Sequence, residues 1–293
     1  LELLTLALCH RGTIFQEQGR HEEAIADFTQ TLALPDVPTA LLAHSLLFRL
    51  ESFGARGQWE DAIADCTNLL ALPNVAAELL AKLLFHRGTL QKNRGQWEAG
   101  IADYGRTIEL PGAPPEFVAR ALCNRAILYQ EQGRHEEAIA DFSVLLARDD
   151  VPADLMVHAL FLRGSCRAEC GKWDDAISDY KLLTELPDIA ADLQQHALLC
   201  VGSYQSARGH WDAAIVTYTR LIELPEAAPA CVAQSLFNRG RLLCEQGHRA
   251  KGLADITRAI EQKDAPQEGV VRWLNCRGLL AFSQGEEDAA LSD

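Results

Sequence analysis

The sequence predicts an all-α fold: an α-solenoid built from antiparallel helix pairs. The first observation is a glycine that returns every 38 residues, without insertion or deletion, from Gly19 to Gly285. The second is helical periodicity of apolar residues on both sides of that glycine. The third is a pair of side-chain columns, one small and one large, that recur with the same period. A fixed period in this range is typical of solenoids, so we predict one continuous array of about 7.5 repeats over residues 1–293, truncated at both ends.

The first helix of each repeat is predicted from apolar residues at spacings of three and four. In the repeat at 76–110, one face carries Leu79, Leu80, Leu83, Leu84 and Leu90. This spacing gives a broad apolar face on an α-helix. Gly95 ends the helix, because glycine adopts the left-handed C-terminal conformation without steric cost. We expect first helices of about 18–19 residues.

The second helix follows the loop glycine. In the same repeat Trp97, Ile101, Tyr104 and Ile108 recur at spacings of four, three and four, and Pro111 stops the pattern. We expect about 14 residues for each second helix. The tryptophans that follow the loop glycine are predicted to lie in the core; they are Trp59, Trp97, Trp173 and Trp211.

Short joins connect the repeats at residues 35–38, 73–76, 111–114, 149–152 and 187–190. Their Asp and Asn residues are suited to helix caps, and their prolines to the first turn of the next helix. The predicted caps are Asp36, Asn74, Asp150 and Asp188, and the predicted first-turn prolines are Pro38, Pro114 and Pro152.

The small column and the large column predict where paired helices cross closely, because small residues opposite large ones allow close packing. The small column is Gly12, Leu50, Gly88, Ala126, Gly164, Gly202, Gly240 and Gly278. The large column is Phe28, Cys66, Tyr104, Phe142, Tyr180, Tyr218 and Ile256.

An arginine column and an aspartate column, sixteen residues apart, predict structural ion pairs between paired helices. Examples are Arg87 with Asp103, Arg125 with Asp141, and Arg163 with Asp179. The sixth repeat has lost both members and carries Val201 and Thr217. Joint loss is what a paired role predicts, because one buried charge without its partner costs several kcal/mol.

Composition excludes several function classes. A formal charge of −14 argues against a nucleic-acid partner, which needs clustered Lys and Arg. No apolar run approaches a membrane span, and no leader is apparent, so we expect a cytoplasmic protein without a membrane partner. The nine cysteines show no zinc-type spacing and are expected to be reduced thiols. There is no phosphate loop, no glycine fingerprint and no convergent carboxylate cluster, so we expect no metal, no cofactor and no enzymatic activity.

The repeat resembles the tetratricopeptide repeat over essentially the whole chain. The family's spacing and residue types occur at Leu122, Arg125, Ala126, Tyr129, Gly133, Ala138 and Phe142, and its common NRG variant at 238–240. The resemblance implies a right-handed superhelix whose first helices line a concave groove for extended peptides or partner helices. Two departures bear on pitch and groove width: the unit has 38 residues where the family usually has 34, and the closing proline comes one residue early.

By this resemblance, the first-helix columns predict a partner-binding groove with cationic or imidazole heads around an apolar stripe. The candidate residues are Lys82, Phe85, His86, Arg120, Asn124, His158, Phe161, His196, Phe237, Asn238, Arg241 and Arg272. The turns Lys82/His86 and Arg120/Asn124 loosely resemble basic-plus-Asn clamps that hold a terminal carboxylate in some family members. An apolar anchor with a polar rim is a typical protein-recognition surface.

We therefore predict a protein-interaction scaffold that binds a peptide or partner protein in the groove. One alternative is a sensor or regulatory region of a larger signalling or defence protein, in contact with other domains of a longer chain. Another is a self-assembling module that associates weakly through its repeat ends, because stacked repeats leave apolar ends unless capping units cover them.

Overall fold

The computed structural model describes residues 2–73, 75–187, 189–262 and 267–282, and every regular element within them is an α-helix. The chain divides into two compact units, residues 1–155 and 156–293, and each is described by itself. The first helices of the repeats are α1 (Glu2–Glu17), α3 (Thr39–Ala55), α5 (Ala77–Asn93), α7 (Pro115–Glu131), α9 (Ala153–Glu169), α11 (Ala191–Ala207), α13 (Pro229–Glu245) and α15 (Gln267–Phe282). The second helices are α2 (His21–Leu32), α4 (Trp59–Leu70), α6 (Trp97–Glu109), α8 (His135–Leu146), α10 (Trp173–Glu185), α12 (Trp211–Ile222) and α14 (Arg249–Ile260).

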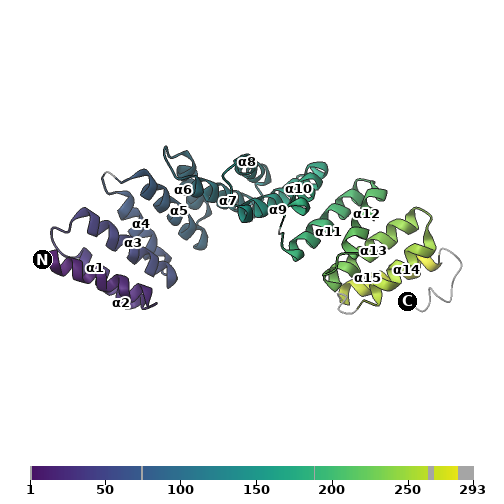
Figure 1. Ribbon diagram of the computed structural model, residues 1–293, viewed down its shortest axis with the longest axis horizontal. Coiled ribbons are helices and arrows are strands. Elements are labelled where there is room, and N and C mark those ends of the chain that lie inside the picture. Colours follow the sequence, from purple (N-terminus) through teal and green to yellow (C-terminus); the bar gives the residue numbers. More distant parts are fainter. Residues whose placement is uncertain (1, 74, 188, 263–266, 283–293) are drawn as a thin grey trace. The chain divides into compact units, whose positions relative to one another are not determined.

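Within each unit, consecutive helices form antiparallel pairs that stack on one another (Figure 1). In unit 1, each of α2, α4 and α6 packs against the first helix of its own repeat and also against the first helix of the next repeat. The same arrangement holds for α12 and α14 in unit 2. The predicted all-α fold of stacked helix pairs is confirmed. That the two units form one continuous array stays a prediction.

The glycine that sets the repeat register closes each first helix, as predicted. Gly133 has φ of 73°, in the left-handed region. Its N–H donates to the Gln130 carbonyl at 2.9 Å, and the Arg134 N–H donates to the Tyr129 carbonyl at 2.8 Å. This pair of bonds is the Schellman motif, which satisfies carbonyls that the helix end leaves free. The next helix starts directly after this turn, and its first turn carries acidic residues because the helix dipole favours negative charge there. Gly285 lies outside the described residues.

The small and large columns meet at the helix crossings. A Cβ built on Gly88 would lie 2.9 Å from the Tyr104 ring, and one on Gly202 would lie 2.6 Å from the Tyr218 ring. Both distances are shorter than real side chains tolerate, so only a glycine or a shifted ring fits there. The aromatic rings are buried, Tyr104 completely. These crossings bring paired helices close and fill the space between them.

The joins differ from the prediction in two respects. Asp36 is no helix cap: it has φ of 56° in the turn before α3, and Pro38 occupies the N-cap position. Pro114 is likewise the N-cap of α7, and Pro115 is the first-turn proline. The helices are therefore shorter than expected, 17 residues for α7 and 12 for α8, because the turns take residues that the periodicity assigned to helix. Asn74 and Asp188 lie outside the described residues.

The tryptophan column was wrongly assigned to the core. Trp97 and Trp211 are exposed to 39% and 38%, and Trp59 and Trp173 are half-buried. Each tryptophan is the first residue of a second helix, where its side chain is only partly buried. Trp173, for example, packs against Tyr204 with ring centroids 5.2 Å apart.

Candidate functional site

The candidate site of unit 1 lies on the surface formed by α3, α5 and α7, here called the first-helix face of that unit. Lys82 and His86 lie one turn apart on α5 and are half-buried. Arg120 and Asn124 have the equivalent positions on α7, where Arg120 is exposed. Arg120 also forms an ion pair with Glu116, one turn earlier on the same helix, at 3.1 Å. The four side chains therefore belong to two neighbouring first helices of one unit.

Phe85 does not extend the exposed stripe. It is only 9% exposed, and its ring packs against Tyr104 and Phe117, each at a centroid distance of 5.8 Å. The side chain fills the core beneath the first-helix face, because the aromatic residue of α6 and the start of α7 close over it. The apolar contact surface that Phe85 was expected to supply comes instead from leucines of α3 and α5.

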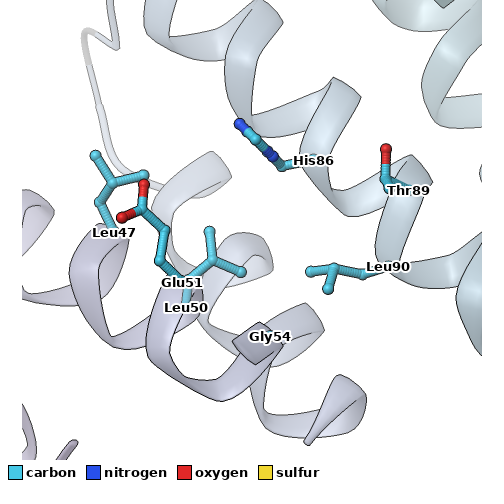
Figure 2. A pocket seen from close by; sticks show the side chains of 7 residues that line it. All are labelled: Leu47, Leu50, Glu51, Gly54, His86, Thr89 and Leu90. Atoms are coloured by element: carbon cyan, nitrogen blue, oxygen red, sulfur yellow. The ribbon is translucent and has the colours of Figure 1, made fainter. Parts of the chain in front are cut away.

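These leucines line a pocket between α3 and α5, with a volume of about 210 Å³ (Figure 2). Its lining residues are Leu47, Leu50, Glu51 and Gly54 of α3 and His86, Thr89 and Leu90 of α5. Figure 2 shows Leu50 of α3 and Leu90 of α5 facing each other, with the Glu51 carboxylate beside Leu47 on the α3 side and the His86 ring on the α5 side. The pocket thus combines an apolar floor with one carboxylate and one imidazole. Of its lining residues, His86 alone is among the predicted groove residues, whereas Leu50 was assigned to a helix crossing and Leu90 to the apolar helix face.

The charges around the pocket are arranged unevenly. Burial lowers the pKa of His86, the cations of Lys82 and Arg120 lower it further, and the Glu51 carboxylate opposes them. The ring is therefore neutral at neutral pH, because an ordinary histidine already loses its proton near pH 6.5. Glu51 accepts a hydrogen bond from Gln16 Nε2 at 2.9 Å and is exposed. The Glu51 carboxylate is thus the one full charge among the seven lining residues.

Asn124 is held by the scaffold beneath it. The Tyr104 hydroxyl lies 3.1 Å from Thr89 Oγ1. Burial raises the pKa of Tyr104, and hydrogen bonds with the Thr89 and Asn124 side chains act in the opposite direction. The tyrosine of a second helix therefore reaches two consecutive first helices and fixes the orientation of polar groups on their exposed face.

In unit 2, the predicted residues form two clusters. His158 of α9 and His196 of α11 are exposed. Phe161 packs edge-on against Tyr180, with ring centroids 5.6 Å apart, and its ring lies 5.4 Å from that of His196. Histidine and phenylalanine therefore share one patch across neighbouring first helices.

The second cluster lies on α13 and α15. Phe237 stacks on Trp273 at 5.5 Å with an interplanar angle of 23°. Asn238 accepts a hydrogen bond from Gln234 Nε2 at 3.0 Å. Arg241 lies 3.7 Å from Glu245, and Arg272 is exposed. The polar groups of this cluster are thus partly engaged with residues of their own helix.

The arginine and aspartate columns meet inside the hairpins. Arg87 donates to Asp103 through Nε at 2.6 Å and Nη2 at 2.7 Å, and Arg163 to Asp179 at 3.0 and 2.6 Å. The aspartates are buried. Bonding to Asp103 raises the pKa of Arg87. This two-point geometry is the strongest form of charge-assisted hydrogen bond.

Two contacts between repeats were not predicted from the sequence. The third donor of several arginines reaches a threonine twenty residues earlier, as in Arg49 to Thr29 at 2.9 Å and Arg87 to Thr67 at 3.2 Å. On the outer edge, the residue before the loop glycine binds a first-turn acid of the previous repeat, as in Arg208 to Asp174 at 2.9 Å and Gln246 to Asp212 at 2.7 Å. Both contacts appear in the sequence as columns offset by 20 and 34 residues.

No group of three or more His, Cys, Asp or Glu side chains among the described residues is placed to hold a metal ion. No helix in the described part of the chain has the length and apolar run that a membrane crossing requires.

Comparison with known proteins identifies the repeat. A tetratricopeptide repeat model matches residues 117–188, and a second tetratricopeptide repeat model matches residues 6–34. No curated protein matches the chain in sequence.

Several solved structures share the fold. A tetratricopeptide repeat protein from Parabacteroides merdae aligns over 94% of this chain and 99% of its own, at 18% identity and a TM-score of 0.55. The C-terminal part of a TPR repeat-containing protein from Cytophaga hutchinsonii aligns over 91% and 99%, at 14% identity and a TM-score of 0.68. The apo form of RapI aligns over 99% and 85%, at 13% identity and 0.63. The family models thus identify tetratricopeptide repeats at residues 6–34 and 117–188, and the solved structures show that the chain shares the fold of tetratricopeptide repeat proteins.

Proposed function

We propose that this chain is a protein-interaction scaffold whose first-helix face binds an extended segment of a partner protein. The observation that carries the proposal is the pocket between α3 and α5, whose lining residue His86 lies within electrostatic reach of Lys82 and Arg120. An apolar pocket with a rim of polar and charged groups is the usual composition of a binding hot spot.

Binding would proceed by recognition on a pre-formed surface, without a chemical step. The helices that carry Lys82, His86 and Arg120 are fixed by buried ion pairs and by helix crossings. A surface that is already ordered loses less conformational entropy when a partner binds. The segment would lie across α3, α5 and α7, with a side chain in the pocket and its neighbours against the charged rim.

The test is selection of binders from a random peptide library displayed on phage, with the whole chain immobilised. Selected peptides are then titrated against the chain and against a Lys82→Glu/Arg120→Glu variant. We expect the double charge reversal to weaken binding by about tenfold or more, since it replaces two rim cations with anions.

The matched control is Lys181→Glu/Arg220→Glu, which makes the same change of charge at exposed positions on the second helices α10 and α12. We expect this control to bind the selected peptides as the unmodified chain does. Equal losses in both variants would contradict the proposal, because net charge would then explain the effect. Failure of the library to yield any binder would contradict it as well.

A further inference from the structure

The second repeat departs from the others at the positions that form the pocket. Where neighbouring repeats pair a glycine with an aromatic ring, as Gly88 with Tyr104, the second repeat carries Leu50 and Cys66. Both residues are buried, and the Cys66 thiol donates to the Leu83 carbonyl at 3.0 Å. The leucine thus supplies bulk from the first helix where other repeats supply it from the second. This exchange puts an aliphatic floor beside α5 and leaves no tyrosine hydroxyl there.

Glu51 is a second departure. In repeats 1, 3, 5 and 6 the equivalent position holds Thr13, Thr89, Ser165 and Ser203. Thr89 and Ser203 lie within hydrogen-bonding distance of the tyrosine hydroxyls of their own repeats, at 3.1 and 3.3 Å. The second repeat has no such tyrosine, and its hydroxyl residue is replaced by a glutamate that lines the pocket and whose carboxylate accepts a hydrogen bond from Gln16 of α1.

Gly54 is the third departure and opens the pocket. Its equivalents are Gln16, Lys92, Gln130, Ala168, Ser206 and Cys244, so every other described repeat has a side chain there. A Cβ built on Gly54 meets only Leu90, at 3.8 Å, which is ordinary contact. The backbone therefore does not require glycine at this position. The missing side chain leaves space beside Leu90 that a ligand can occupy.

From these three departures of the second repeat we propose that the pocket receives the side chain of a lysine or arginine in the partner segment. The inference rests on the proposed function and specifies its ligand. The aliphatic stem of such a residue fits against Leu47, Leu50 and Leu90, as long basic side chains commonly bury their stems on apolar surface. Its cationic head meets the Glu51 carboxylate, whose hydrogen bonds to a cation are stronger than neutral ones. The chain's net charge of −14 also favours approach of a basic segment.

The remaining charged groups set the order of residues in the ligand. Besides burial, Lys82 on α5 and Arg120 on α7 lower the pKa of His86, whereas Glu51 on α3 raises it. They would repel a second basic residue and attract an acidic one. The preferred segment therefore carries its basic residue over α3 and an acidic residue, or a terminal carboxylate, toward α5 and α7.

The experiment compares peptides selected from the phage library with synthetic analogues whose shared basic residue is replaced by norleucine, which keeps the stem and removes the charge. On the unmodified chain we expect norleucine to weaken binding by about tenfold. On Glu51→Thr, which installs the residue of repeats 1 and 3, the same replacement should change binding less than about twofold. Selection against Glu51→Lys should yield an acidic residue at the shared position.

Three results would overturn the inference while leaving the proposed function intact. These are selection of an apolar or acidic residue at the shared position by the unmodified chain, an equal norleucine penalty on Glu51→Thr, and an unchanged basic preference on Glu51→Lys. If no peptide binds at all, the proposed function and the inference fail together.

Discussion

Arg125 of α7 donates two hydrogen bonds to Asp141 of α8, from Nε at 2.7 Å and from Nη2 at 2.8 Å. The Asp141 side chain is 9% exposed and that of Arg125 is 19% exposed. Bonding to Asp141 raises the pKa of Arg125. Arg49 and Arg87 each donate a further hydrogen bond to a threonine twenty residues earlier, whereas the equivalent residue next to Arg125 is Gly105. The pair therefore lacks the threonine contact of Arg49 and Arg87, which makes it suitable for measuring what the two-residue ion pair contributes.

Replacing this pair should show strong coupling between its two members. Arg125→Val leaves a buried carboxylate without its cation and should lower the free energy of unfolding by about 2–4 kcal/mol. Adding Asp141→Thr recreates the combination that the sixth repeat carries at Val201 and Thr217, and should recover part of that loss. Urea unfolding of the four proteins of the cycle measures the coupling. Strictly additive losses would show that the residues do not act as a pair.

The loop glycines should be required for conformation alone. Gly133 has φ of 73°, and a Cβ built on it meets no atom within 4 Å. Gly133→Ala should therefore destabilise the chain by about 1–2 kcal/mol through left-handed backbone strain. Gly133→Asn should cost less, because asparagine tolerates this conformation better. Thermal unfolding compares the variants, and a larger loss for asparagine than for alanine would disagree with this explanation.

The outer contacts between repeats should contribute little to stability. Arg208 binds Asp174 at 2.9 Å, but both side chains are about half exposed or more. Arg208→Gln introduces the residue that Gln246 provides in the next repeat, where it binds Asp212. We expect the free energy of unfolding to change by less than about 0.5 kcal/mol, and any change to shrink with added salt. A loss comparable to that of Arg125→Val would mean that this contact has been underestimated.

His86 should make stability sensitive to acid. Burial lowers its pKa in the folded chain, whereas the unfolded chain has the ordinary value near 6.5. Since the folded state binds the proton less readily, the stabilisation is fully present above about pH 6.5 and is lost as the pH falls below it. Wild type should thus lose more stability than His86→Gln between about pH 7.5 and pH 5.5 in urea titrations. The same exchange at exposed His158 is the control, and an equal effect at both positions would contradict the assignment.

The helix pairs could be predicted from sequence because the contacts that make them recur at constant offsets. The positions of Gly88 and Tyr104, like those of Arg125 and Asp141, are sixteen residues apart, and most repeats keep equivalent residues there, so each contact appears as two matching columns. Proline and aspartate in the joins were less informative. Asp36 adopts a left-handed turn conformation where a helix cap was expected, because the turn before α3 needs a residue that tolerates positive φ.

The pocket could not be predicted in the same way. The groove prediction assumed that equivalent residues face the same surroundings in every repeat. Phe85 shows why this fails: its ring turns into the core because Tyr104 and Phe117 provide contacts there. The pocket depends on three residues that differ from their own columns, Leu50, Glu51 and Gly54, and on their meeting α5 of the next repeat. Outliers within each column are therefore the sequence signal of the pocket, whereas the regular columns indicate only the scaffold.

In the proposed complex the partner segment anchors in the pocket between α3 and α5, and Gly54→Gln tests this anchoring by filling the pocket. Glutamine stands at the equivalent positions 16 and 130, and the site tolerates a Cβ, so the variant should fold and be at least as stable as wild type. The new side chain should fill the space beside Leu90. The control is Val144→Arg on the exposed face of α8, which installs the residue that Arg106 provides in the third repeat. Isothermal titration of a library-selected peptide should give binding at least about tenfold weaker for Gly54→Gln and unchanged for Val144→Arg. Equal affinity for Gly54→Gln and wild type would contradict the claim.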